Sequence, residues 1–569
     1  MKPGRLPLWI VLCAAFGAAH GFVNFESSKT YLRNNIQLSG AAGMTGEAYH
    51  TDGPSNYRPA ASGRLTFSPS LSILNLVTLS ADVMLSTEGS YNRQSMNILG
   101  LHPTWKWGRA HLGDYSESFS KYSFNGTNVK GIELDLFPGL WRFTAGGGQT
   151  RRAVEGDATN QSFSQYLYAG RLGYGSPNGN YIDLIGLHLR DDETSLEHPL
   201  EEEGRVNPDT LETDLDTVWL KPPDNPYAVT PQENLVAGFA GQLCLLGKRV
   251  VLNLEMCGSA FTKDLYAEAA DLDSVDLPGF VSKPLSYVFT PRQGSSLDMA
   301  LSSSVQWNTP RVRTQAGYNY VGPGYVSLGA GSVLNDRREL QFSTAVSLGK
   351  SRVQASWTRM TDNLLGQKLS TNVRNQIGTS FGTSFRQWYS QYGLNAMLMS
   401  NDASSDSLAW DYTNLTLTTA QGLRFKPDKR VRQVGLQYTY QTSEKALFNR
   451  TDLSSYHTAS LNSGMRIRDN MSLSGSAGLS FRSTEAKGSY LTQVYSAGLS
   501  HAAFKNRLCS SLSAASSMVR DTRVFRAGLT ANYFLTRRAQ LTSDVSYNYI
   551  SGKETYAEQR ASLSLSHSL

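Results

Sequence analysis

A two-residue alternation of apolar and polar side chains recurs along much of this chain and limits the folds open to it. From Leu541 to Tyr549 the odd positions are mostly leucine, valine or tyrosine, and the even positions are threonine, aspartate, serine and asparagine. The same order recurs from Val250 to Cys257 and from Gln433 to Tyr440. Because successive side chains of a strand point to opposite faces, each segment predicts a β-strand with one apolar and one polar face.

Strand and connection lengths separate a soluble β-sandwich from a membrane barrel, since both alternate. From about residue 128 onward the expected strands run about 11 to 15 residues, longer than the usual strand of a soluble sheet and enough to cross a bilayer at a tilt. Their connections alternate between tight and long. Tight turns are expected at 137–140, 176–179, 246–248, 308–310, 348–350, 426–429, 468–470, 505–506 and 536–538, and longer connectors at 152–162, 192–232, 264–295, 323–336, 401–413 and 443–455. This alternation is typical of barrels with short periplasmic turns and long external loops.

The two ends of the chain agree with export. Lys2 and Arg5 precede an apolar run and a small-residue cleavage region at Ala19–Gly21, which predicts a secretory signal peptide over residues 1–21. The closing segment Ala561–Leu569 alternates up to the last residue and resembles the final strand of bacterial outer-membrane β-barrels, with Leu569 where that family usually has an aromatic residue.

Composition excludes several other classes. Mean hydropathy is −0.33, and no apolar run of about 18 residues follows the signal, so helical membrane spans are not expected. Charged residues make up 18% of the chain, which suits a lipid-facing wall without charge. Of the four cysteines, Cys244, Cys257 and Cys509 lie outside the signal, an odd number at no metal-ligand spacing. We therefore expect no disulfide framework, metal site or cofactor.

The fold expected from these features is all-β, a single large antiparallel transmembrane β-barrel of about 24 strands, within a range of about 20 to 26. We assign residues 22–61 to an N-terminal segment, periplasmic or lumenal, and residues 62–569 to the barrel. A large plug domain of the kind found in TonB-linked transporters is not expected, because strands begin by about residue 62.

Candidate binding and catalytic residues give weak signals. Residues 191–217 are rich in Asp and Glu and could bind divalent cations, but a solvated loop is the favoured interpretation because no Asp-x-Asp-x-Asp-Gly calcium motif occurs there. Gly378–Gly382 matches a nucleophile-elbow pattern but lies inside an alternating strand. His188, Asp191 and Asp192 could imitate a rim protease site. We predict no catalytic, cofactor-binding or metal-binding residues, and no enzyme activity.

The segment from Tyr318 to Gly329 is dense in glycine and tyrosine. It is similar to a stretch of uncharacterised large barrels of Bacteroidota-like bacteria. Glycines permit a bend or a bulge, and tyrosines can line an interfacial girdle or a loop that folds inward.

The sequence therefore predicts an outer-membrane barrel of a Gram-negative envelope that acts as a pore or receptor for solutes or polymers. A structural or secretion-system component that binds other envelope proteins is the main alternative, and a surface enzyme is a further one. Expected partners are membrane lipid and lipopolysaccharide, the barrel assembly machinery and other envelope proteins. Basic residues at the tight turns, such as Lys248 and Arg537, could contact headgroup phosphates, but the solubility of the turns is the favoured explanation. No nucleic-acid partner is expected.

Overall fold

The computed structural model of the chain describes residues 36–53, 59–88, 97–155, 161–196, 201–206, 213–220, 229–270, 287–405, 408–425, 430–447, 450–485 and 488–569. The side chains of 201–206, 213–220 and 431 lie outside this description. The expected signal peptide, residues 1–21, also lies outside the described residues. None of the helical segments within the described part combines the length and apolarity needed to cross a bilayer.

Antiparallel strands dominate the described chain, and 26 of them form one sheet. Before the longest connector the strands are β1 Ile36–Thr51, β2 Ala61–Ile73, β3 Val77–Ser86, β4 Ile98–Trp105, β5 Gly108–Ser118, β6 Asn125–Leu136, β7 Trp141–Arg151, β8 Gln165–Gly175 and β9 Tyr181–Asp191. That connector contains a separate hairpin of β10 Glu201–Val206 and β11 Thr213–Leu220.

The remaining strands continue the same sheet. They are β12 Glu233–Leu245, β13 Val250–Thr262, β14 Ser296–Asn308, β15 Val312–Val321, β16 Arg337–Leu348, β17 Ser351–Asp362, β18 Asn372–Phe385, β19 Trp388–Asn401, β20 Trp410–Arg424, β21 Val431–Leu447, β22 Arg450–Arg468, β23 Met471–Thr484, β24 Gly488–Ala503, β25 Leu508–Val519, β26 Thr522–Phe534, β27 Ala539–Ser551 and β28 Tyr556–Ser568. A short 3-10 helix, η2, spans Leu328–Ala330.

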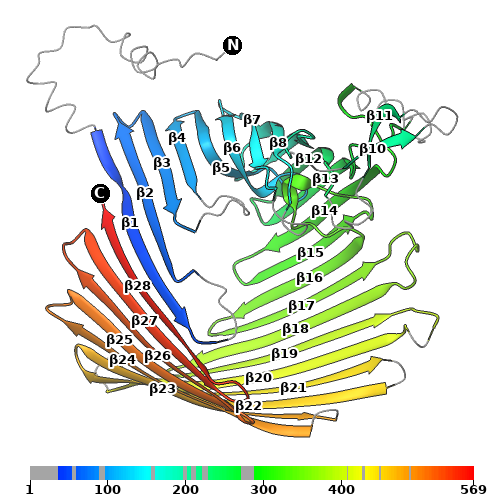
Figure 1. The fold of residues 1–569 in the computed structure, drawn as a ribbon. Coiled ribbons are helices and arrows are strands. Elements are labelled where there is room, and N and C mark those ends of the chain that lie inside the picture. The colour runs from blue at the N-terminus through cyan, green and yellow to red at the C-terminus, as the bar shows by residue number, and fades with distance from the viewer. Residues whose placement is uncertain are drawn as a thin grey trace, which may run out of the picture.

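The sheet closes on itself because β1 pairs with both β2 and β28. Figure 1 shows blue β1 lying alongside red β28, with the C-terminus close to the start of β1. Across this seam Thr45 Oγ1 lies 3.0 Å from Ser564 Oγ, and Arg560 forms a 2.7 Å salt bridge with Glu47. Closure gives every strand of the 26-stranded sheet two neighbours, as hydrocarbon requires, because lipid offers no partner to an open sheet edge.

The predicted alternation of side chains is confirmed by the two faces of the wall. On β6, Ile132 and Leu134 point outward and are 63% and 42% exposed in the isolated chain, whereas Glu133 and Asp135 are buried inside. On β27, Val545 and Tyr547 point outward, and Asp544 points inward. The apolar outer face and the closed antiparallel sheet together confirm a transmembrane β-barrel, with a strand number at the top of the predicted range.

The predicted start of the barrel at residue 62 is wrong, because β1 begins at Ile36 and closes the cylinder. Residues 36–51 therefore belong to the wall and not to a separate N-terminal segment. The signal was weak because Gly, Ala, Ser and Thr fill most of β1, leaving Ile36, Leu38 and Met44 as its large apolar outward residues.

The predicted connections that fall on described residues are mostly confirmed, and the predicted turn at 426–429 lies outside the described residues. The predicted loop at 443–455 is wrong, because β21 extends to Leu447 and β22 begins at Arg450. The polar run from Thr442 to Lys445 was interpreted as a loop, yet its backbone pairs with β20 and β22. Strands of this length project beyond the membrane, where a polar outward face carries no penalty.

Candidate functional site

The lumen of the barrel gathers the buried polar groups and is the candidate functional site. Its wall over β5–β9 carries an ionic network. Asp135 accepts hydrogen bonds from Arg109 (3.0 Å), Thr144 (2.7 Å) and Arg171 (3.3 Å). Nearby, Arg142 forms a 2.7 Å salt bridge with Asp183. Arginines lie beside both carboxylates, so the charge of this part of the wall is largely neutralised.

The loop between β5 and β6 folds into the lumen and packs on this wall. The backbone amides of Lys121 and Tyr122 donate to the carboxylate of Glu255 on β13, at 3.3 and 2.7 Å. Phe124 is fully buried, and the Arg171 guanidinium lies 5.1 Å from the centre of the Phe119 ring. The carboxylate of Glu255 therefore fixes the tip of the loop by accepting two backbone N–H groups.

The loop between β15 and β16 covers the first loop. Tyr325 Oη donates to the backbone carbonyl of Tyr122 (2.7 Å), and Ser327 Oγ donates to that of Ser123 (2.6 Å). Asn234 on β12 fixes the other side, donating to the carbonyl of Val326 (3.0 Å) and accepting from the amide of Leu328. These residues and the apolar side chains beneath them form one buried cluster, which we call the inner cluster: Tyr115, Phe119, Tyr122, Phe124, Val129, Leu167, Ile185, Leu187, Leu189, Val236, Ala240, Cys257, Ala300, Val321 and Tyr325.

Burial changes the acid–base behaviour of the loop residues. It raises the pKa of Tyr122 to about 12, and the carboxylate of Glu255 adds to the shift. The pKa of Tyr325 is raised for the same reason, with further contributions from Cys257 and Glu255. Burial lowers the pKa of Lys121. Both phenols remain neutral at physiological pH, so they act as hydrogen-bonding anchors and not as bases.

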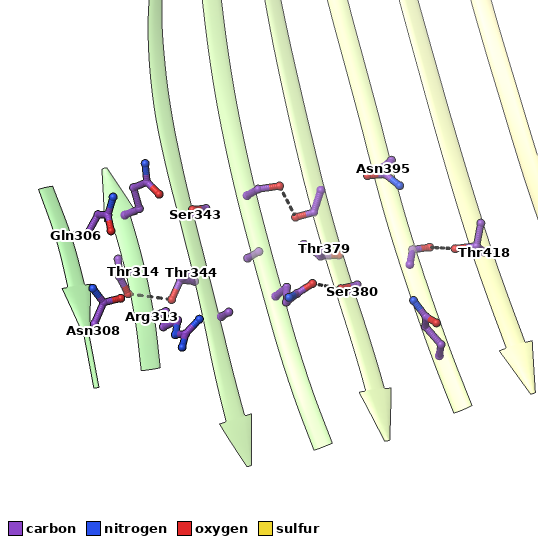
Figure 2. Close-up of a pocket in the computed structure, with 18 residues that line it drawn as sticks. Gln306, Asn308, Arg313, Thr314, Ser343, Thr344, Thr379, Ser380, Asn395 and Thr418 are labelled. Atoms are coloured by element: carbon purple, nitrogen blue, oxygen red, sulfur yellow. Dashed lines mark hydrogen bonds between the residues drawn. The ribbon is translucent and has the colours of Figure 1, made fainter. Parts of the chain in front are cut away.

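The lumen wall over β14–β20 differs in chemistry. A concave region of about 670 Å³ lies there, and Arg313 is the single charged residue among those that line it. Figure 2 shows its side chains spread over adjacent strands, with Thr314 and Thr344 joined by a 3.0 Å hydrogen bond. The inward-facing members are amides and hydroxyls: Gln306, Asn308, Gln315, Ser343, Gln354, Ser356, Ser380, Gln391, Asn395 and Thr418. Such groups offer both donors and acceptors without a net field.

The structure does not assemble the rim residues considered in the sequence. His188 and Asp191 lie three positions apart on β9, so their side chains point to opposite faces of the sheet. His188 Nε2 lies 2.8 Å from a carboxylate oxygen of Glu233. Asp191 is buried against Arg151 and Gln165, and Asp192 accepts from Thr194, so both acidic groups have structural partners. Most of the acidic segment 191–217 lies outside the described side chains.

Other sequence interpretations can be placed as well. Gly378–Gly382 lies within β18, as expected for a strand, and therefore makes no nucleophile elbow. The glycine- and tyrosine-rich segment from Tyr318 forms the end of β15 and then the inward loop, and Tyr325 is its anchor. The inner cluster as a whole was not predicted. Its members come from many strands and only the barrel register brings them together.

Comparisons with known proteins place the chain in no family. No family model matches the sequence, and no curated protein matches it. Among solved structures, the chain is similar to the siderophore receptor PirA from Pseudomonas aeruginosa, with 8% identity and a TM-score of 0.35 over 93% of this chain and 80% of that one. It is also similar to the P pilus usher PapC translocation pore, with 10% identity and a TM-score of 0.25 over 94% and 99%.

A third similarity is to OccAB2 of Acinetobacter baumannii, with 10% identity and a TM-score of 0.28 over 60% of this chain and 93% of that chain. Alignments at these TM-scores carry no functional assignment. The predicted relationship to Bacteroidota-like barrels gains no support from the comparisons.

Proposed function

We propose that this chain is an outer-membrane channel that passes neutral, hydroxyl-rich solutes along the concave region over β14–β20, whose lining is mainly amides and hydroxyls. The observation that carries the proposal is the contrast between the two walls. The wall over β5–β9 is covered by inward loops and paired charges. The wall over β14–β20 presents amide and hydroxyl groups, with Arg313 as the single charged residue that lines its concave region.

The size of the cylinder supports a water-filled lumen. With 26 strands, a spacing of about 4.8 Å and a tilt of about 40°, a circular barrel has a backbone diameter of about 50 Å. Side chains take roughly 5 Å from each wall, half the spacing of packed sheets. The inward loops 119–124 and 322–336 are short segments seated on one wall, so a wide space remains beside them.

Neutral solutes fit this wall for a physical reason. A hydroxyl-rich molecule exchanges hydrogen bonds with water for hydrogen bonds with Ser, Thr, Asn and Gln at little net cost, whereas a strongly charged wall would retain ions of opposite sign. Weak contacts at many positions let a solute enter and leave. The proposal assigns no catalytic role to the chain, and it implies contacts with lipid, lipopolysaccharide and the barrel assembly machinery.

Conductance in planar bilayers, combined with liposome swelling in uncharged oligosaccharides, tests the proposal. We expect a stable open conductance, and swelling that is faster with neutral sugars than with sugar acids of similar size. The double variant Ser356→Asp/Ser380→Asp should shift the reversal potential toward cation selectivity, whereas Ser356→Asn/Ser380→Asn should not. A barrel that inserts but stays closed, and that co-purifies with envelope proteins, would overturn the channel and favour the structural alternative.

A further inference from the structure

Three potential metal ligands converge on the lumen wall where β5 and β6 meet. One ligand atom of each of His111, Glu117 and Glu133 lies within 4.8 Å of the others. Glu133 is 2% exposed, and its Oε1 has no hydrogen-bond partner. A buried carboxylate oxygen without a donor is costly, so an additional positive group at this point would stabilise the fold.

The bend of β5 creates this convergence. Arg109 and Glu117 form a 3.0 Å salt bridge although eight positions separate them, a span of about 26 Å in a straight strand. Two irregularities lie in this stretch: Gly113 has a φ of 96°, which favours glycine and where a Cβ would clash with the carbonyl oxygen of Leu99, and the pairing of β5 with β6 shifts register between Ser116 and Ser118. Glu117 is thereby returned toward His111, whose cross-strand partner on β6 is Glu133.

Close polar contacts surround both nitrogens of His111. His102 Nε2 lies 3.5 Å from Asp82, and His102 Nδ1 lies 2.8 Å from His111 Nδ1, so one of the two rings donates to the other. On the far side of its ring, His111 Nε2 lies 3.4 Å from Glu117 Oε1 and has no hydrogen-bond partner. This nitrogen therefore faces the Glu117 carboxylate beside the unpartnered oxygen of Glu133, and in the tautomer protonated at Nδ1 it offers its lone pair to a metal ion.

We propose that His111 Nε2, Glu117 and Glu133 bind a divalent transition-metal ion, with Zn²⁺ as the preferred ion. One imidazole nitrogen and two carboxylate oxygens form a ligand set that Zn²⁺ accepts, and imidazole disfavours Mg²⁺ and Ca²⁺. Metal–ligand bonds of about 2.1 Å place ligand atoms at most about 4.2 Å apart, so small side-chain rotations close the site. His102 supports the ligand from behind, as outer partners of metal-bound histidines do.

The surroundings fit an accessible site. A cavity of about 710 Å³ is lined by His111, His102 and Asp82, so an ion can enter from the lumen and a water molecule can take a fourth position. Tyr115 stacks on the His111 ring with centroids 5.7 Å apart, which fixes the plane of the imidazole. Arg109 contacts Oε1 of Glu117, and the remaining lone pairs of that carboxylate stay available to the ion. A bound ion would clamp the bend of β5 and the base of the inward loop.

The test uses the full chain in detergent with all four cysteines replaced by serine, which removes thiolate competitors. After chelation and dialysis, calorimetric titration with ZnCl₂ should give one site per chain, while MgCl₂ and CaCl₂ should give none. We expect His111→Gln and Glu133→Gln each to weaken Zn²⁺ binding at least tenfold, because removal of even an outer-shell partner of a metal ligand costs about 10- to 100-fold. The control Glu339→Gln, an inward carboxylate on β16, should leave the affinity unchanged.

X-ray absorption at the zinc edge provides a readout that needs no variant at the site. The loaded protein should show only nitrogen and oxygen neighbours, at 2.0–2.2 Å, with a histidine signature. Absence of Zn²⁺ binding by a folded barrel, or binding that both ligand variants retain, would overturn the proposal. Neither outcome bears on conductance, so the channel proposal stands or fails separately.

Discussion

Tyr325 anchors the inward loop 322–336 in the lumen, and its removal should release that loop without unfolding the barrel. The side chain is 1% exposed, contacts Tyr122 edge to face, and donates to the Tyr122 carbonyl at 2.7 Å. Tyr325→Phe leaves that buried carbonyl without its donor, which costs about 1–3 kcal/mol. Tyr325→Ala also creates a cavity and should cost about 3–5 kcal/mol. The strand ladder is untouched, so the cost falls on docking of the loop.

Hydrogen exchange measures this docking directly. The amides of Ala330 and Val333 are hydrogen-bonded within the loop and should exchange about 5- to 150-fold faster in Tyr325→Phe, because about 1.4 kcal/mol is a factor of ten. Tyr325→Ala should accelerate them by about a hundredfold or more. Tyr547→Phe, on the lipid face of β27, is the matched control and should change nothing. Unchanged exchange in Tyr325→Ala, or equal acceleration in all strands, would refute the assignment of Tyr325 as a local anchor.

Two further predictions concern pH and backbone geometry. Burial raises the pKa of Asp336, but hydrogen bonds from Lys368 and from backbone amides outweigh it and hold the pKa below the ordinary value of 3.8. The contact between Asp336 and Lys368 therefore adds its full stability above pH 3.8 and loses it as the pH falls through the pKa of Asp336 in the folded protein. The amide of Leu364, which donates to Asp336, should lose protection from hydrogen exchange over that acidic range. Asp336→Asn should remove this pH dependence. Gly113→Ala should lower the temperature of the heat-induced mobility shift on gels, because its strained φ and the clash with β4 cost more than about 2 kcal/mol. Gly186→Ala, where a Cβ has open space, should leave that temperature unchanged.

The sequence predicts the wall well and the lumen poorly, for one physical reason. Alternation is local, so a segment such as 541–549 reveals its faces without knowledge of its neighbours. β1 was not predicted as a strand because glycine, alanine and serine can face either lipid or water, and a segment with few large side chains shows no two-residue alternation.

Non-local geometry limited the prediction of the site. Glu133 meets His111 through the register of β5 with β6, and Glu117 reaches them where β5 is irregular, at Gly113 and between Ser116 and Ser118. No spacing in the sequence predicts that His111, Glu117 and Glu133 lie together. The inward position of Tyr325 was easier to predict, because the glycine-rich segment around it indicated a loop able to fold inward.

Cysteine accessibility along β27 tests the transmembrane alternation most directly. In a background without Cys244, Cys257 and Cys509, single cysteines are placed at each position from 541 to 549 and exposed to a water-soluble thiol reagent in lipid vesicles. The account predicts labelling at even positions, which face the lumen with Asp544, and protection at odd positions, which face lipid with Val545. Labelling without a two-residue period, or protection of the even set, would contradict a sealed cylinder with a water-facing interior.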